Sequence, residues 1–258
     1  MMIKATCIST VHDEYGPIYV YQNRINRILS FDGDIEQGCM NLNNPAELMH
    51  KYAQAMMTGC IFLPSIETAS VMGLGTGSMV KCLLNSFQEL SVHAIELRQE
   101  VIKTAKKYFH LPDDPRLQLH NNDAVGYMNT AKIKSDIIFS DLYNTHGMEP
   151  RQVQLSYLRR CKKSLTEKGV LVLNLWIQDF RSTAEIEDLL SHEFENRLIS
   201  FTVAGGNTIV LAFKNEIPSI QRNELLSRAK KLQQQMEVPI VQYAKLIWSQ
   251  QQYKFAID

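Results

Sequence analysis

Short apolar runs alternate with helical patterns through the middle of the chain. The runs have the length of strands, whereas the segments between them repeat apolar residues every three or four positions, as an amphipathic helix does. The predicted strands are 68–72, 91–95, 116–120, 136–139 and 169–175, and the predicted helices are 76–87, 98–109, 124–130, 150–165 and 182–190. Strands that alternate with helices indicate a parallel sheet with helices on both faces.

The last part of this region has a different pattern. Residues 195–203 and 208–213 are strand-like, and the turn Gly205-Gly206-Asn207 between them can join only antiparallel neighbours. We therefore expect an α/β fold whose mostly parallel sheet ends in a C-terminal antiparallel hairpin. This plan is typical of Rossmann-like class I S-adenosylmethionine-dependent methyltransferases and their relatives.

The beginning of the chain has β character. Apolar runs at 18–20 and 25–31, followed by the turn Asp32-Gly33-Asp34, predict a small N-terminal β unit. Residues 45–58 then have helical spacing, and Pro45 suits a first helical turn.

The tail, 218–258, has the pattern of two helices broken at Val238-Pro239. Three roles are open for it: a lid, a dimer contact or core packing. We expect three parts: an N-terminal β unit over 1–44, a Rossmann-like nucleoside-binding domain over 45–215 and a helical extension over 216–258.

The amino-acid composition argues against several classes of function. The 258 residues carry 27 basic and 27 acidic side chains, and a net charge of zero argues against a general nucleic-acid or acidic-membrane binder. No apolar run approaches the roughly 20 residues of a membrane span. The five cysteines are scattered, without a C-x-x-C pair or zinc spacing. We expect a reduced, metal-free, cytoplasmic protein.

A glycine-rich turn lies between the first predicted strand of the sheet and its helix. In Gly73-Leu74-Gly75-Thr76-Gly77 the glycines allow a sharp turn and a close approach to a ligand. Glu96 ends the next strand, where a carboxylate can accept hydrogen bonds from both ribose hydroxyls. The Gly-x-Gly-x-Gly spacing favours an adenosyl-sulfonium ligand over a dinucleotide. The alternative is a structural role only, in which the glycines serve the turn and Glu96 is a solvated residue at the end of a strand.

Asp123 and Ala124 follow the next strand. An aspartate at this place in the fold can accept a hydrogen bond from the exocyclic amine of adenine. It can equally cap the following helix, or do both.

Four stretches together resemble the spermidine synthase (polyamine aminopropyltransferase) family, and in particular its bacterial spermidine-synthase-like branch. They are Phe31–Gln37, Tyr52–Pro64, the block from Val71 through Glu96 to Arg116, and Asn122–Asp141. The likeness spans about residues 15 to 215, and ordinary methyltransferases lack its N-terminal β unit.

The resemblance implies transfer of an aminopropyl group from decarboxylated S-adenosylmethionine to a polyamine such as putrescine. It places a carboxylate that orients and deprotonates the amine at Asp141, and it places Gln37, Tyr52 and Tyr143 on the substrate side. It also implies a homodimer, without nucleic-acid or membrane partners.

Two positions depart from the family pattern, which usually has aspartate at both. Thr76 faces the donor tail, and Asn144 faces the distal amine of the acceptor. A neutral hydrogen bond is worth less than a charge-assisted one, so each change weakens the hold on a cation about tenfold. Two alternatives therefore stay open: a methyltransferase that uses intact S-adenosylmethionine on an unknown small acceptor, and a nucleoside-binding relative without catalysis.

Isolated histidines and a tryptophan lie outside these motifs. His50, His110, His120 and His146 fall on different predicted elements, and we interpret such lone histidines as structural. Trp176 follows the last parallel strand, where it either lines the pocket or belongs to the core.

Overall fold

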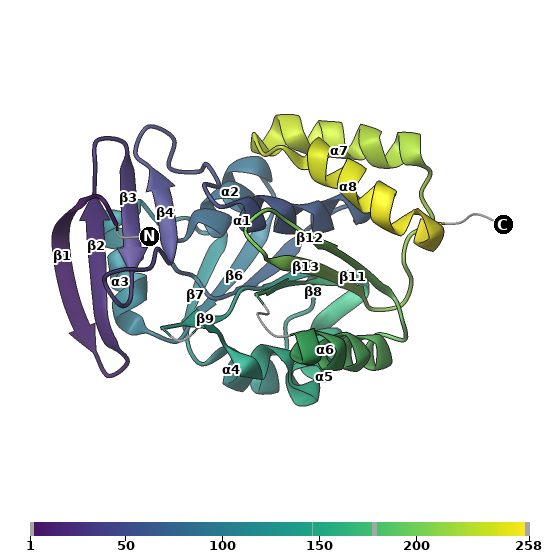
Figure 1. Ribbon diagram of the computed structural model, residues 1–258, viewed down its shortest axis with the longest axis horizontal. Coiled ribbons are helices and arrows are strands. Elements are labelled where there is room, and N and C mark those ends of the chain that lie inside the picture. Colours follow the sequence, from purple (N-terminus) through teal and green to yellow (C-terminus); the bar gives the residue numbers. More distant parts are fainter. Residues whose placement is uncertain (1–2, 146, 177–179, 256–258) are drawn as a thin grey trace.

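A seven-stranded sheet forms the centre of the computed structural model, which describes residues 3–145, 147–176 and 180–255 (Figure 1). Its strand order is β12-β13-β11-β8-β5-β6-β7. The strands are β5 (Thr68–Met72), β6 (Ser91–Glu96), β7 (Leu117–Asn121), β8 (Ser135–Ser140), β11 (Leu165–Leu175), β12 (Leu198–Thr202) and β13 (Thr208–Phe213). Strand β13 runs antiparallel to both of its neighbours, β11 and β12, and the other adjacent pairs of described strands are parallel. The expected fold class is confirmed.

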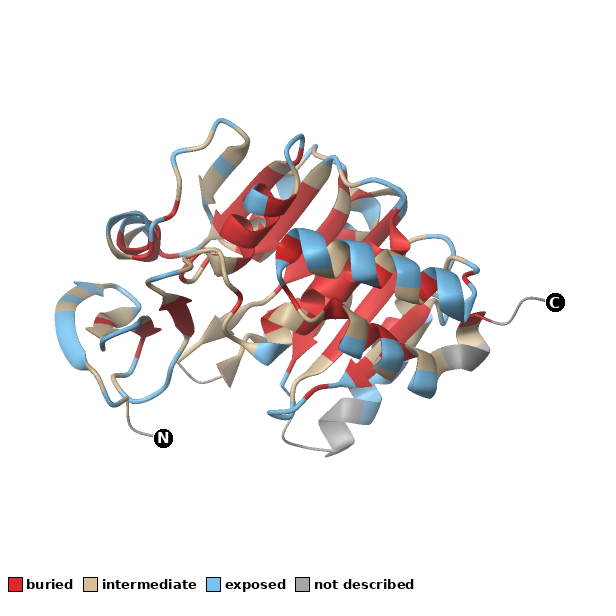
Figure 2. Cartoon of the chain, turned by 90° about the horizontal axis from the view of Figure 1, so that it is seen from above, coloured by how far each residue is buried: buried red, intermediate tan, exposed pale blue. Residues whose placement is uncertain are grey.

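Helices cover both faces of the sheet (Figures 1 and 2). One face carries α1 (Lys51–Met56), η1 (Met57–Phe62), α2 (Ser78–Ser86), α7 (Arg222–Met236) and α8 (Ile240–Gln251), and the other carries α4 (Ala124–Thr130), α5 (Leu155–Ser164) and α6 (Phe180–Glu193). Alternation along β11 supplies both cores: Val170 and Val172 pack into the first, and Leu171 and Leu173 into the second. Such a strand is apolar on both faces, as expected for a buried parallel sheet.

A second, four-stranded antiparallel sheet precedes the central one. It consists of β1 (Thr6–Asp13), β2 (Gly16–Gln22), β3 (Asn26–Ser30) and β4 (Gly38–Asn41), in that order. Ile18, Val20 and Leu29 pack against Val101 and Phe109, at and after helix α3 (Gln99–Tyr108). The sequence pattern missed β1 because this edge strand exposes most of its residues and lacks alternation.

Several predicted boundaries are wrong, and three of them have a clear local cause. Helix α1 begins at Lys51 rather than Pro45, because Glu47 N–H bonds to the Asn44 carbonyl and closes a turn around Pro45. The predicted helix 150–165 is split into η2 (Pro150–Val153) and α5 by the extended residue Gln154.

The third wrong boundary is that of β12, which starts at Leu198 rather than Glu195. Glu195 and Asn196 adopt φ values of +54° and +60°, the left-handed region that ends a helix rather than starting a strand.

The tail acts as core packing. Leu225 and Ala229 of α7 and Ile240 and Ala244 of α8 are fully buried against the sheet side that η1 and α2 also cover. The break at Val238-Pro239 separates the two helices as expected, and η3 (Gln252–Phe255) follows them. The last part of the predicted tail, 256–258, lies outside the described residues. Within the described part, no helix combines the length and apolarity needed to cross a membrane.

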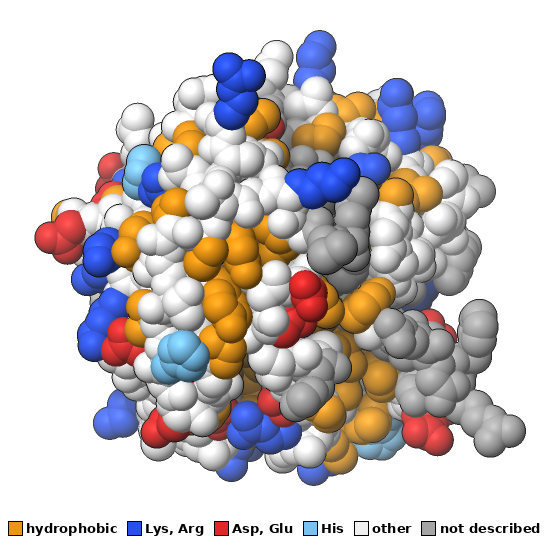
Figure 3. All heavy atoms as spheres, turned by 60° about the vertical axis from the view of Figure 1, so that its left-hand side comes forward, with side chains coloured by type: hydrophobic (Ala, Val, Ile, Leu, Met, Phe, Trp, Pro, Cys, Tyr) orange, Lys and Arg blue, Asp and Glu red, His pale blue; other side chains and the backbone are white. Residues whose placement is uncertain are grey.

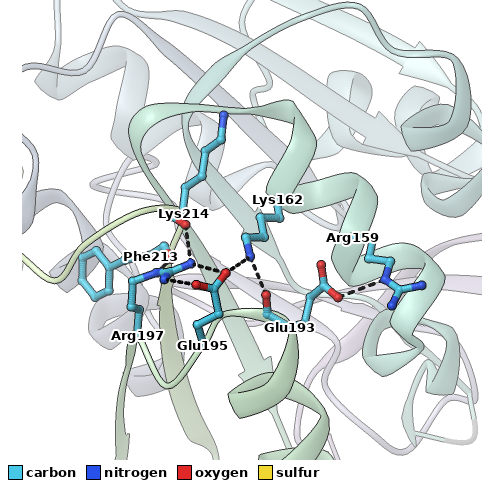
Figure 4. A network of polar contacts seen from close by, with 7 residues as sticks. All are labelled: Arg159, Lys162, Glu193, Glu195, Arg197, Phe213 and Lys214. Atoms are coloured by element: carbon cyan, nitrogen blue, oxygen red, sulfur yellow. Dashed lines mark hydrogen bonds and ion pairs between the residues drawn. The ribbon is translucent and has the colours of Figure 1, made fainter.

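A charged network fastens the ends of α5 and α6 to the sheet (Figure 4). Glu195 pairs with Arg197 at 2.8 Å and with Lys162 at 3.1 Å, and Arg159 pairs with Glu193 at 3.0 Å. Hydrogen bonds from Arg197 and Lys162 lower the pKa of Glu195 to about 2. Each of these ion pairs has one partner that is more than half exposed, Glu195 or Arg159, so we assign the network an orienting role rather than a large share of stability.

Candidate active site

A cavity of about 870 Å³ lies at the carboxyl ends of the parallel strands. Its lining includes Gly73 after β5, Glu96 at the end of β6, Asp123 after β7 and Asp141 after β8. Residues 35–39 of the N-terminal unit close another side. Figure 3 views the molecule from the side of this unit, where hydrophobic side chains gather near the centre of the face. Ligands of open α/β sheets bind at this edge.

The glycine turn has the backbone shape that the sequence predicted. Gly73 and Gly75 have φ values of +92° and +52°. A Cβ on Gly73 would lie 2.4 Å from the Asp141 carbonyl oxygen, whereas a Cβ on Gly75 would meet open space. Thr76 lines the cavity but is 4% exposed, and its hydroxyl is 2.7 Å from that of Ser78. Gly77 is not part of the lining; it turns the chain into α2.

Glu96 is held by the backbone of the same turn. One carboxylate oxygen accepts from Leu74 N–H at 3.1 Å, and the other accepts from Arg98 N–H at 3.0 Å. Burial raises the pKa of Glu96 above its usual value, although these backbone donors oppose the rise. Gly75 N–H also donates to this carboxylate, and three backbone donors leave one of its four acceptor positions for a hydroxyl group.

The Arg98 side chain joins the N-terminal sheet to this end of the cavity. Its guanidinium bonds to both Asp13 oxygens, at 2.8 and 3.0 Å, and lies 4.7 Å from the centroid of the Phe31 ring. The turn between β1 and β2 is thereby fixed beside Glu96.

Asp123 has the capping role that the sequence allowed. It accepts from Gly126 N–H at 2.9 Å and so caps α4, whose first residue, Ala124, also lines the cavity. Its two oxygens also lie 3.0 and 3.2 Å from the Arg151 guanidinium, a partner the sequence did not reveal. An adenine amine would have to share this carboxylate with Arg151.

Asp141 is a partly buried carboxylate of the cavity lining. Asn174 donates to its Oδ1 at 2.8 Å, and the Tyr52 hydroxyl donates to it as well. Burial raises the pKa of Asp141 above the usual value, while Asn174, His50 and Tyr52 oppose the rise. Burial likewise raises the pKa of Tyr52, reinforced by the Asp141 charge. A carboxyl group whose pKa is moved toward neutrality is a stronger base once ionised.

The remaining substrate-side predictions also reach the cavity. Gln37, Tyr143 and Asn144 all belong to its lining. Tyr143 Oη donates to the Asn174 carbonyl at 3.4 Å, and Asn144 Nδ2 donates to Glu149 at 3.4 Å. Asn144 lies in a small hairpin of β9 (Tyr143–Asn144) and β10 (Gly147–Met148), between which His146 lies outside the described residues.

Three further residues of the site were missed or misinterpreted. His50 is no lone structural histidine: its Nε2 lies 2.7 Å from Glu36, and its ring stacks on Tyr52 with centroids 5.3 Å apart. Asn174 carried a usable signal, since it interrupts the otherwise apolar run of β11. Arg151 carried none, because Asp123, its partner across the cavity lining, is distant in sequence. Trp176 lines the cavity and is 41% exposed, which excludes a core position.

No group of three or more His, Cys, Asp or Glu side chains in the described ranges is placed to hold a metal ion. The site offers carboxylates to the sugar and base of a nucleoside, and a partly buried carboxylate to an amine. This arrangement suits a transfer reaction between an adenosyl donor and a nucleophile.

Known proteins share this fold, and some match most of the chain at modest sequence identity. The family model for the spermine/spermidine synthase domain matches residues 50–197. A polyamine aminopropyltransferase of Neisseria meningitidis is 29% identical over 209 residues, covering 80% of this chain and 79% of that protein. A probable spermidine synthase from Corynebacterium glutamicum has a TM-score of 0.75 at 18% identity and covers 87% of this chain and 86% of its own. Human methyltransferase-like protein 13, solved with SAH, has a TM-score of 0.66 at 22% identity and covers 73% of this chain and 93% of its own.

Proposed function

The chain belongs to the spermine/spermidine synthase family, a family of transferase enzymes, and on this premise we propose that it transfers an aminopropyl group to an amine. The proposed donor is decarboxylated S-adenosylmethionine. Putrescine, a polyamine that the resemblance implies, is the reference acceptor. The homodimer that the resemblance implies stays a prediction.

The reaction needs a neutral amine. The amine lone pair attacks the aminopropyl carbon, the carbon–sulfur bond breaks, and its electron pair stays on sulfur to give methylthioadenosine. Alkyl amines have a pKa near that of lysine, about 10.4, so the acceptor arrives protonated at neutral pH. Asp141 orients this amine and accepts its proton. Glu96 and Asp123 hold the adenosine, and the open side of Gly75 admits the sulfonium tail.

The pairing of the cavity arginines supports the decarboxylated donor. Among the described lining residues, the only arginines or lysines are Arg98 and Arg151. Both are in ion pairs: Arg98 with Asp13, and Arg151 with Asp123 and Glu149. The carboxylate of intact S-adenosylmethionine would find no unpaired arginine or lysine here, and it would enter a cavity that contains Asp141. A donor that has lost this carboxylate avoids the repulsion.

Methyl transfer from intact S-adenosylmethionine is the second candidate. One observation favours it: Thr76 presents a neutral hydroxyl where an aspartate would repel the donor carboxylate. The likeness to human methyltransferase-like protein 13 shows that the same fold occurs in a methyltransferase.

The test is product analysis with both donors. Purified protein at high concentration is incubated with each donor and a panel of small amines, and methylthioadenosine and S-adenosylhomocysteine are quantified. We expect methylthioadenosine from the decarboxylated donor and its loss in Asp141→Asn. Formation of S-adenosylhomocysteine alone would establish the methyltransferase alternative. If neither product forms, the remaining alternative is a nucleoside-binding protein without catalysis.

A further inference from the structure

Neutral side chains surround the part of the cavity beyond Asp141. Tyr143, Asn144, Asn174, Trp176 and Asn207 line it, and we call these five residues the neutral end. Asn207 donates to Asn174 at 2.9 Å, and Asn174 donates to Asp141 at 2.8 Å. The amides therefore form a chain that leads to one carboxylate.

The other carboxylates near the neutral end already have partners. Glu149 accepts from Arg151 Nε at 2.9 Å; although burial would raise the pKa of Glu149, hydrogen bonds from Arg151 bring it below the usual value. Glu36 lies 2.7 Å from His50 Nε2. An acceptor amine can thus pair with Asp141, but a second ammonium group farther along would compete with Arg151 for Glu149 or remain without a carboxylate. Burying an unpaired ammonium is costly.

Trp176 gives the neutral end an apolar wall. Trp176 directly follows β11, two residues after Asn174, and both side chains line the cavity. The indole Nε1 lies 3.6 Å from where a Cβ on Gly206 would be, so the ring lies beside the turn that joins β12 and β13. With 41% of its surface exposed, Trp176 can cover an alkyl or aromatic tail.

We propose that the acceptor carries a single primary amine on an uncharged, apolar tail, with the amine on Asp141 and the tail against Trp176. This inference rests on the proposed function, because it names the acceptor class of the same site. It makes the cationic diamines poorer acceptors than monoamines of equal length.

The test uses two probes with the same carbon chain, n-pentylamine and 1,5-diaminopentane. Each is titrated calorimetrically into protein saturated with methylthioadenosine, so that binding is measured without turnover. We expect n-pentylamine to bind at least about tenfold more tightly, since a buried ammonium without a partner loses a charge-assisted hydrogen bond. Equal or tighter binding of the diamine, or binding of neither amine, would overturn the inference.

Two variants and a control sharpen the result. Asn144→Asp supplies a carboxylate and should shift the preference toward the diamine about tenfold. Trp176→Ala should weaken n-pentylamine about fivefold, because a few methylene contacts are lost. Ile25→Ala removes an apolar side chain that is 54% exposed and outside the cavity, and it should change neither.

The proposed function is tested separately in the same samples. When the decarboxylated donor replaces methylthioadenosine, a bound monoamine that yields no product overturns aminopropyl transfer and leaves the acceptor class standing. Product formation with a preference for the diamine supports aminopropyl transfer and overturns the proposed acceptor class.

Discussion

The two ends of the cavity are built in different ways. At the nucleoside end, backbone amides hold the carboxylates: Leu74 and Arg98 N–H hold Glu96, and Gly126 N–H holds Asp123. At the neutral end, side-chain amides hold the carboxylate, through the chain from Asn207 to Asn174 to Asp141. Backbone donors depend on the fold alone, whereas side-chain donors change with each substitution. Under the proposed function, the fold fixes the adenosyl part of the substrate pair and leaves the acceptor open to variation.

The largest effect should come from Asp141. Asp141→Asn keeps the shape but removes the base, and we expect transfer to fall about 10²- to 10⁴-fold while methylthioadenosine binds as before. Steady-state product formation and calorimetry measure the two quantities. Asp188→Asn, on the exposed side of α6, is the matched control. If methylthioadenosine binding and turnover fall equally, Asp141 belongs to the nucleoside end. The two ends of the cavity would then not be functionally distinct.

For Glu96 we expect the opposite result, a loss of nucleoside binding that exceeds the loss of rate. Glu96→Gln replaces a charge-assisted bond to the ribose with a neutral one, so methylthioadenosine should bind about 10- to 100-fold more weakly. Glu100→Gln, in the first turn of α3, should leave the affinity unchanged. The rate at saturating donor should fall much less than the affinity does. A rate loss as large as that of Asp141→Asn contradicts this assignment.

A smaller effect should appear in the pH profile of Tyr52→Phe. Burial raises the pKa of Asp141, and the Tyr52 hydroxyl opposes that rise by donating to the ionised form. Loss of the hydroxyl therefore raises the pKa further. Because only ionised Asp141 accepts a proton, activity is lost as pH falls through this pKa, and the acid limb should move to higher pH in the variant. An acid limb that stays in place or moves to lower pH would show that Tyr52 does not support Asp141.

The smallest expected effect concerns Arg151, which connects the two ends through Asp123 and Glu149. Its side chain is 42% exposed, so these ion pairs are partly screened. Arg151→Gln should tighten methylthioadenosine up to about threefold, since the arginine no longer competes with adenine for Asp123. Weakening by tenfold or more would mean that Arg151 itself binds the ligand, and the nucleoside end would then extend farther than we assign.

The same contrast explains what could be predicted from the sequence. The glycine turn, Glu96, and Asp123 as a helix cap follow from local patterns, since each lies at the junction of a strand and a helix. His50 and Arg151 could not be found this way, because their partners Glu36 and Asp123 lie in other elements and only the folded chain brings them together. The wrong helix start at Pro45 has a similar origin: proline suits both a first helical turn and the β-turn that forms here.

Side-by-side calorimetry with decarboxylated and intact S-adenosylmethionine tests the central claim most directly. Both donors share the adenosine that the nucleoside end holds, and they differ only in the carboxylate that the paired arginines leave without a partner. We predict that the decarboxylated donor binds at least about tenfold more tightly. Tighter binding of the intact donor would contradict aminopropyl transfer and place the protein among the methyltransferases.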